Sequence, residues 1–268
     1  MQSLDLDFDF VARVSGFVVG ERDSFESGGR QQFCVSVEQP GLTLDRIVAG
    51  MLKNGACTEN SQLRQKYVVK MFSVLRIIAK AIHRLHAFGV VHGNVTPQSC
   101  GKFDDQWKLL GTLSFQKVGA RFDTGSFGES VPPEALEPQQ SGLALDRQAA
   151  FRTNVVVDPS IDIWGFGKMA YDVLVGEPLI HFDPRKGIND HRGLLKILHW
   201  STLDIVEAKG RLRRAGVPDS GVDLITRCLS HDPGSRPNSM NEILQGGVWD
   251  NLQRPVPTPA QEESLHEC

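Results

Sequence analysis

The longest periodic segment of the chain runs from about residue 65 to residue 88, where apolar side chains recur at every third or fourth position. These positions are Val68, Met71, Phe72, Leu75, Ile78, Ile82 and Leu85. Such spacing places them along one face of a helix, and Gly89 is a suitable residue to end it. The pattern therefore predicts a long amphipathic helix with one buried face.

Basic side chains lie mostly away from this apolar face. They are Lys66, Lys70, Arg76, Lys80 and Arg84. Two interpretations of these charges stay open. They form a binding site for an acidic partner, or they are simply the solvated face that such helices present to water.

Two further helices are predicted nearer the C-terminus. From 158 to 174 apolar residues occur on nearly all sides, which is typical of a buried helix. A short amphipathic helix is expected at 222–230, and Ser239 precedes Glu242 by the three positions of a capping box. The polar residues that follow the buried helix are expected in a solvent-exposed loop. They are His181, Asp183, Asp190 and His191.

Short alternating segments predict strands elsewhere in the chain. They are 8–19 (a strand or a hairpin), 33–37, 100–103 and 106–110. Residues 38–41 break the pattern and 42–48 open another helix, whereas 21–30 and 141–157 have the composition of loops. Helices and strands are therefore mixed along one chain, as in an α+β fold.

Composition narrows the class of protein. The 268 residues carry a net charge of −3, which lacks the basic excess of a general nucleic-acid or membrane-surface binder. The cysteines are scattered and odd in number, which indicates reduced thiols rather than a disulfide framework. They are Cys34, Cys57, Cys100, Cys228 and Cys268. No signal peptide or membrane-spanning run is recognisable, so we expect an intracellular protein, cytoplasmic or nuclear.

Four short blocks carry the chemical information of the chain. They are 92–99 (HGNVTPQS), 131–134 (VPPE), 162–167 (DIWGFG) and 228–237 (CLSHDPGSRP). The first resembles the catalytic loop of protein kinases, and the second resembles the Ala-Pro-Glu motif that closes their activation segment. The third is similar to the Asp-x-Trp-Ser-x-Gly block of their central helix, and the fourth to a late block with an invariant arginine. From about 33 to 249 the chain thus resembles a protein kinase.

The resemblance assigns structural roles to three charged residues. It implies a buried ion pair between Glu134 and Arg236 that anchors the activation segment. It also implies that Asp162 accepts hydrogen bonds from the backbone of the catalytic loop. The alternative is that all three are solvated surface charges.

The same resemblance implies that the catalytic groups are missing. His92 is retained, but Asn94 takes the position of the catalytic base, Ser99 that of a magnesium-binding asparagine, and Gly111 that of the aspartate of Asp-Phe-Gly. Gly93 replaces the arginine that receives an activating phosphate. The first 52 residues contain no lysine to clamp the phosphates of ATP. No catalytic or cofactor-binding residue is therefore assigned.

Other side chains near these blocks suggest alternatives. Asp104 and Asp105 are expected in a strand turn, and Asp123 belongs to the activation-like segment, from which it could swing inward. Residues in the same segment are candidates for phosphorylation. They are Thr124, Ser126 and Ser130. His83, His86 and His92 suggest a metal site, but the resemblance makes His86 and His92 packing and loop-bracing residues and places His83 on the helix, so we expect no metal.

The sequence therefore predicts an α+β, protein-kinase-like fold with a mostly helical C-lobe and a truncated N-lobe. Residues 1–32 are expected to form a partial N-lobe, 33–254 the hinge and C-lobe, and 255–268 a disordered tail.

The predicted function is that of a pseudokinase, an inactive kinase-like scaffold that binds or regulates proteins, such as an active kinase or its substrate. No nucleic-acid or membrane partner and no cofactor are expected, and ATP or magnesium binding is disfavoured. The alternatives are a divergent kinase that binds ATP and retains Ser/Thr phosphotransferase activity, and a decayed gene copy.

Overall fold

The computed structural model describes residues 11–12, 14–20, 32–54, 61–111, 114–122, 128–138, 149–152, 154–183, 185–187 and 190–251. Its helices are α1 (Leu44–Asn54), α3 (Ser61–Ala87), α4 (Ser160–Val175), α5 (His191–Leu198), α6 (Thr202–Arg214), α7 (Asp219–Cys228), α8 (Met240–Gln245) and α9 (Val248–Asn251). Single turns of 3-10 helix are η1 (Pro97–Ser99), η4 (Pro133–Ala135) and η6 (Pro233–Ser235).

The strands are short and form separate small sheets. They are β1 (Val14–Gly20), β2 (Gln32–Val37), β3 (Leu42–Thr43), β4 (Val90–Val91), β5 (Cys100–Phe103), β6 (Gln106–Leu109), β7 (Gln116–Lys117), β8 (Leu136–Pro138) and β9 (Ala149–Phe151). All ladders are antiparallel, in the orders β1-β2, β3-β5-β6, β4-β7 and β8-β9. The mixture of helices and strands agrees with the α+β class.

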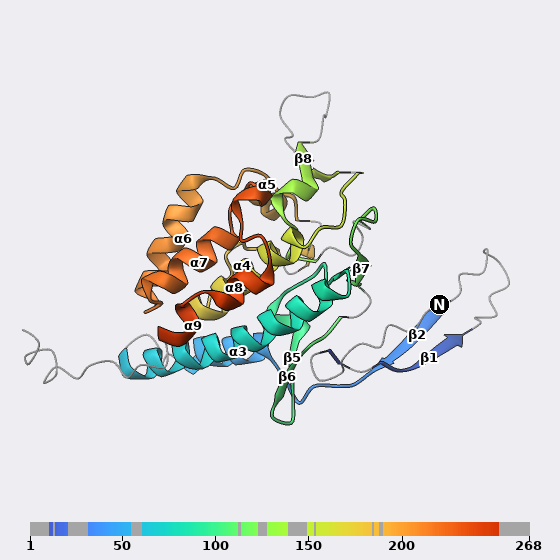
Figure 1. Ribbon diagram of the computed structural model, residues 1–268, viewed down its shortest axis with the longest axis horizontal. Helices are drawn as coiled ribbons and strands as arrows, with labels where there is room; N and C mark the ends of the chain where they lie inside the picture. Colours follow the sequence, from blue (N-terminus) through green and yellow to red (C-terminus); the bar gives the residue numbers. More distant parts are fainter. Residues whose placement is uncertain are drawn as a thin grey trace, which may run out of the picture.

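Helix α4 forms the centre of the helical part of the molecule (Figure 1). Every residue from Ile161 to Leu174 is buried, which confirms the prediction of a buried helix. A Cβ at Gly167 would lie 2.7 Å from the Cβ of Cys228, so glycine at this position allows α4 and α7 to pack closely. The close packing of α4 on α7 therefore holds the segment 162–167, which contains Asp162, in place.

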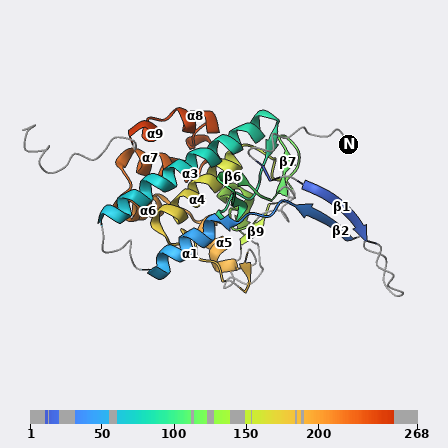
Figure 2. The same ribbon diagram turned by 90° about the horizontal axis from the view of Figure 1, so that it is seen from below.

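Helix α3 runs along the edge of this helical part and is seen lengthwise in Figure 2. Its apolar stripe is buried against α4, α8 and β6, as the periodicity predicts. The helix begins at Ser61, four residues earlier than predicted, and Gly89 follows its end. It leads directly into β4 and the loop at 92–99.

The two predicted strands at 100–103 and 106–110 are confirmed as β5 and β6, with Asp104 and Asp105 in the turn between them. This hairpin carries the end of the loop at 92–99 on one side and leads to Gly111 on the other. The predicted strand at 33–37 is β2, and it pairs with β1. Both views show this β1–β2 hairpin extending away from the helices (Figures 1 and 2).

Three sequence predictions need correction. The helix expected from Leu42 begins at Leu44, because Leu42 and Thr43 pair with β5 instead. The region expected to be a polar loop after α4 contains α5 from His191, directly followed by α6. In the expected loop at 141–157, Ala149–Phe151 pair with β8, and Val155 and Val157 hydrogen-bond to the segment at 119–122.

Several predictions fall outside the described residues. These are the loop at 21–30, the tail at 255–268 and the first part of the segment at 141–157. Among the residues that the structure describes, no helix is long and apolar enough to cross a membrane.

Candidate functional site

His92 begins the loop between β4 and η1 and is fully buried. Its Nδ1 accepts from the N–H of Asn94 at 3.2 Å, so the proton is on Nε2, which donates to the carbonyl oxygen of Leu110 at 2.7 Å. Burial lowers the pKa of His92 more than the nearby carboxylate of Asp162 raises it. His92 is therefore a neutral side chain that ties the loop to the end of β6.

Asp162, in the first turn of α4, forms hydrogen bonds with the backbone of the same loop. Its Oδ2 accepts from the N–H of His92 at 2.7 Å, and its Oδ1 accepts from the N–H of Gly93 at 2.8 Å. His86 of α3 also contacts Oδ2, through Nε2 at 2.9 Å. Burial raises the pKa of Asp162, but the hydrogen bond and charge of His86 and the loop N–H outweigh it, so the net pKa lies below the ordinary value. The resulting carboxylate fixes three groups at once.

Two of the three residues that the resemblance assigns to catalytic positions form hydrogen bonds within the fold. Ser99 caps η1: its hydroxyl donates to the carbonyl of Thr96 at 2.8 Å and accepts from the N–H of Thr96 at 2.9 Å. Asn94 Oδ1 accepts from the hydroxyl of Ser130 at 3.1 Å. Gly111 has a φ of +90° and no side chain. These three positions thus present an amide, an occupied hydroxyl and bare backbone.

Glu134 and Arg236 are brought together across 102 positions of sequence. The guanidinium donates to both carboxylate oxygens at 2.7 Å, in the bidentate geometry of a strong pair. Arg236 also donates to the carbonyls of Ser230 at 2.9 Å and Ser160 at 3.0 Å. Its guanidinium lies 5.2 Å from the centre of the Trp164 ring. The arginine side chain is fully buried and the glutamate side chain is 23% exposed, so the pair joins η4 to the helical core.

The other acidic and hydroxyl side chains that the sequence analysis considered lie in different environments. Asp104 and Asp105 lie in an exposed turn, and Asp105 pairs with Lys102 at 3.1 Å. Ser130, one of the candidates for phosphorylation, is only 2% exposed, and its hydroxyl donates to Asn94 Oδ1. Asp123, Thr124 and Ser126 lie outside the described residues.

The structure also shows the environment of Asp190, one of the polar residues after α4, and of two of the histidines. Asp190 was expected to be exposed but is buried, because it caps α5 and accepts from the N–H groups of Asp183 and Arg192. These backbone bonds lower its pKa. His86 and His92 bind Asp162 and Leu110, as described above. Within the described residues, no group of three or more His, Cys, Asp or Glu side chains is arranged to hold a metal ion.

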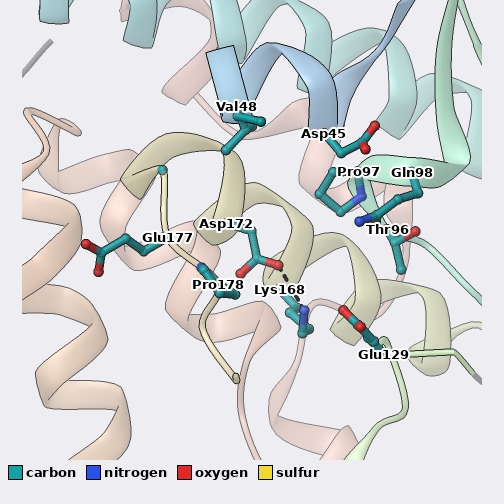
Figure 3. A pocket seen from close by; sticks show the side chains of 12 residues that line it. Asp45, Val48, Thr96, Pro97, Gln98, Glu129, Lys168, Asp172, Glu177 and Pro178 are labelled. Carbon is teal, nitrogen blue, oxygen red and sulfur yellow. Dashed lines mark hydrogen bonds and ion pairs between the residues drawn. The ribbon is translucent and has the colours of Figure 1, made fainter. Parts of the chain in front are cut away.

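A pocket of about 360 Å³ lies between α1, the loop at 96–98 and α4 (Figure 3). Its charged lining consists of four carboxylates and one ammonium group. They are Asp45, Glu129, Asp172, Glu177 and Lys168. Lys168 Nζ donates to Asp172 Oδ2 at 2.9 Å, and burial raises the pKa of Asp172 against the opposing effect of Lys168. Asp45 Oδ1 is buried and has no hydrogen-bond partner within the described part of the chain.

Sequence reasoning missed this pocket. The signal was present, because Lys168 and Asp172 are opposite charges four positions apart in a mostly apolar helix. Charged side chains are rarely fully buried unless they are paired. The remaining lining comes from four segments, at 45–49, 96–98, 129 and 176–178, which no local pattern connects.

Comparison with known proteins gives a consistent answer. No protein-family model matches the chain. It is 24% identical over 199 residues to a serine/threonine-protein kinase of Suid herpesvirus 1 (strain Kaplan), covering 66% of this chain and 56% of the relative. It is 25% identical over 197 residues to cGMP-dependent protein kinase 2 of Mus musculus (69% and 23%). It is 25% identical over 206 residues to a SNF-related serine/threonine-protein kinase of Rattus norvegicus (77% and 23%).

The chain thus spans about half of the viral relative and about a quarter of the two others. The names of these relatives are those of protein kinases, the family whose motifs the four sequence blocks resemble. All of these relatives are protein kinases, and the similarity therefore supports a protein-kinase-like family for this chain.

Proposed function

We propose that this chain is a catalytically inactive protein-kinase-like domain that acts by binding other proteins. The observation that carries the proposal is the chemistry of three positions facing the expected nucleotide site. Phosphoryl transfer needs a carboxylate to orient the substrate hydroxyl and two magnesium ligands. Asn94, Ser99 and Gly111 offer no carboxylate, and the Ser99 hydroxyl already bonds Thr96 on both its donor and acceptor sides.

The proposal extends to the N-lobe, which we infer to be reduced. Ahead of the hinge-like residues 38–41, the described residues form the β1–β2 hairpin and a bridge from Val11 to Leu109. Residues 1–52 contain no lysine that could clamp the phosphates of ATP. Both features support the proposal that these 268 residues by themselves bind nucleotide weakly or not at all.

The pocket beside α1 supports a binding role. Its carboxylates outnumber its single ammonium group, and that group is already paired with Asp172. A partner segment with arginine or lysine would find unneutralised acceptors at Asp45 and Glu129. We therefore expect basic polypeptide segments to bind there in preference to acidic ones.

The first experiment measures the thermal unfolding midpoint of the full chain with and without millimolar ATP, each with and without magnesium. A ligand at a hundredfold excess over its Kd adds about 2.7 kcal/mol, which raises the midpoint by a few degrees. We expect no shift, with an active protein kinase measured in parallel as the positive control. A magnesium-dependent shift together with transfer of labelled phosphate would establish the divergent kinase instead.

The second experiment tests the binding role at the pocket. A labelled nine-residue peptide containing three arginines is titrated by fluorescence anisotropy against the chain and against the double variant Asp45→Asn, Glu129→Gln. We expect the variant to bind about tenfold more weakly, while the exposed control Glu207→Gln behaves like the parent chain. Equal affinity of all three proteins would remove the pocket from the proposal.

A further inference from the structure

Helix α3 presents a straight line of exposed side chains on the side away from the core. The positions advance by alternating steps of four and three residues, so they stay on one face and span about 27 Å along the helix axis. They are Lys66, Lys70, Ser73, Ile77, Lys80 and Arg84. This α3 stripe is the outer counterpart of the apolar face that packs on α4.

The charge of α3 is one-sided. Its 27 residues include six lysines and arginines and no aspartate or glutamate, in a chain whose net charge is −3. Among the residues that the structure describes, Lys66, Lys70 and Lys80 take part in no ion pair. Arg76 lies at the border of the α3 stripe. Its Nε is buried and has no hydrogen-bond partner among the residues that the structure describes. The solvated charged faces of α6 and α7 differ, because their charges pair with one another.

One apolar side chain, that of Ile77, lies among the basic ones of the stripe and is 36% exposed. Leu63, one turn before Lys66, is 46% exposed, and Phe88, directly after the end of α3, is 50% exposed. Nucleic-acid phosphates are bound by cationic and polar groups, and they gain nothing from exposed Ile, Leu or Phe side chains. A polypeptide with both carboxylates and apolar side chains would satisfy both kinds of position.

The geometry of the stripe also restricts the shape of the partner. Side chains spaced by four and three residues are those by which helices pack lengthwise on one another. A second copy of the chain placed symmetrically on this face would bring lysine against lysine, which is unfavourable. We propose that the α3 stripe binds an acidic amphipathic helix of a partner protein.

This inference goes beyond the proposed function, because it holds whether or not the domain transfers phosphate. The α3 stripe is also a different surface from the acidic pocket, which is lined by α1, the loop at 96–98 and α4 but not by α3. The two surfaces prefer partners of opposite charge, so their tests can fail independently.

The test uses two synthetic helical peptides of three heptads. Both carry leucine at the first and fourth heptad positions; one has glutamate at the flanking positions and the other lysine. Their binding to the full chain is measured by fluorescence anisotropy at 50 mM and 300 mM salt. The variant is Lys66→Glu, Lys70→Glu, Lys80→Glu. Its control is Lys117→Glu, Arg185→Glu, Lys186→Glu, which makes the same charge change at exposed positions elsewhere.

We expect the acidic peptide to bind the parent chain and the control, and to bind about tenfold more weakly at high salt. The α3 variant should lose the acidic peptide and gain the basic one. Misfolding cannot cause the variant to gain binding to the basic peptide. An unfolding transition equal to that of the parent chain would show in addition that the variant is folded.

Three outcomes would overturn the proposal. One is equal binding of the acidic peptide to parent and α3 variant. Another is tighter, lysine-dependent binding to duplex DNA or to vesicles containing phosphatidylserine, since the partner would then be a different macromolecule. The third is self-association of the parent chain that the α3 variant abolishes, which would assign the stripe to a second copy.

Discussion

The loop at 92–99 has two sides that differ in chemistry. On the side of α4, Asp162 accepts two backbone N–H bonds from the loop and contacts His86, and it is fully enclosed. On the opposite side, Asn94 and Gly111 carry no charge. The first side holds the loop in place, whereas the second is where a kinase would place its carboxylates.

The difference teaches which groups the fold itself requires. A catalytic carboxylate is exposed to a cleft and forms few bonds with its own protein, so its replacement leaves packing intact. A carboxylate such as Asp162 or Glu134 is the partner of buried donors, and its removal leaves those donors unsatisfied. A chain can therefore lose the catalytic carboxylates and still fold, provided that it keeps carboxylates such as Asp162 and Glu134 that bind buried donors.

The largest expected effect comes from Glu134→Ala. It leaves the buried guanidinium of Arg236 without its carboxylate, and we expect a loss of about 3 kcal/mol in the free energy of unfolding, measured with urea. The matched control is Glu177→Ala, whose pair with Arg211 is exposed and should contribute less than about 1 kcal/mol. Similar losses in both variants would mean that η4 is not anchored by its ion pair.

Asp162→Asn is expected to cost about 2–3 kcal/mol at pH 7, because the amide cannot accept from all three donors. The folded pKa of Asp162 is lowered, so its carboxylate stabilises the fold above the unfolded pKa of about 3.9. That contribution is lost as the pH falls below this value. The gap between parent and variant should therefore shrink below about pH 4 in urea titrations. A gap independent of pH would contradict the role of the charge.

On the opposite side of the loop, Gly111→Asp would reintroduce a carboxylate at the magnesium position. Because Gly111 has a φ of +90°, any side chain there strains the backbone, and we expect a loss of about 1–2 kcal/mol. We also expect no magnesium-dependent ATP shift, since Asn94 and Ser99 are unchanged. Gly247→Asp, at an open position without positive φ, is the control and should change stability by less than about 0.5 kcal/mol. A gain of ATP binding from Gly111→Asp alone would show that one ligand restores the site.

These expectations rest on features that the sequence reveals unequally. The buried faces of α3 and α4 follow from the spacing of apolar residues, because a helix repeats its neighbours every three or four positions. The contact of Glu134 with Arg236 spans 102 positions, so only the resemblance of the motif order to that of kinases pointed to it. The contact of Ser99 with Thr96 is local, within the capping box of η1, but Ser99 was assigned only from the resemblance, without considering this cap.

Helices α5 and α6 were not predicted from the sequence. Helix α5 has only 8 residues, too few for its apolar residues to show a clear helical period, and α6 ends in the charged residues Arg211, Arg213 and Arg214. Their helical state depends on the caps at Asp190 and Ser201 and on packing against α7 and β8. Where the local apolar pattern is weak, tertiary contacts thus decide whether a segment is helical.

The smallest expected effect concerns His92, which tests whether the retained histidine belongs to the structural side of the loop. His92→Gln keeps an N–H donor for the carbonyl of Leu110, so the loss at pH 7.5 should be about 1 kcal/mol. The folded pKa of His92 is lowered below 6.5 by burial, so the unfolded chain takes up its proton first as the pH falls. The parent chain should therefore lose stability below about pH 6.5, and His92→Gln should show a shallower decline.

His86 also contacts Asp162, so His86→Gln must be measured beside it to separate the two histidines. If His92→Gln and the parent decline equally with pH, the titrating group is elsewhere and His92 is not held neutral. If the decline is shallower only in His92→Gln, the imidazole is a fixed support between the loop and β6. The one motif histidine that this chain retains would then be explained by folding alone, in the same way as Asp162 and Arg236.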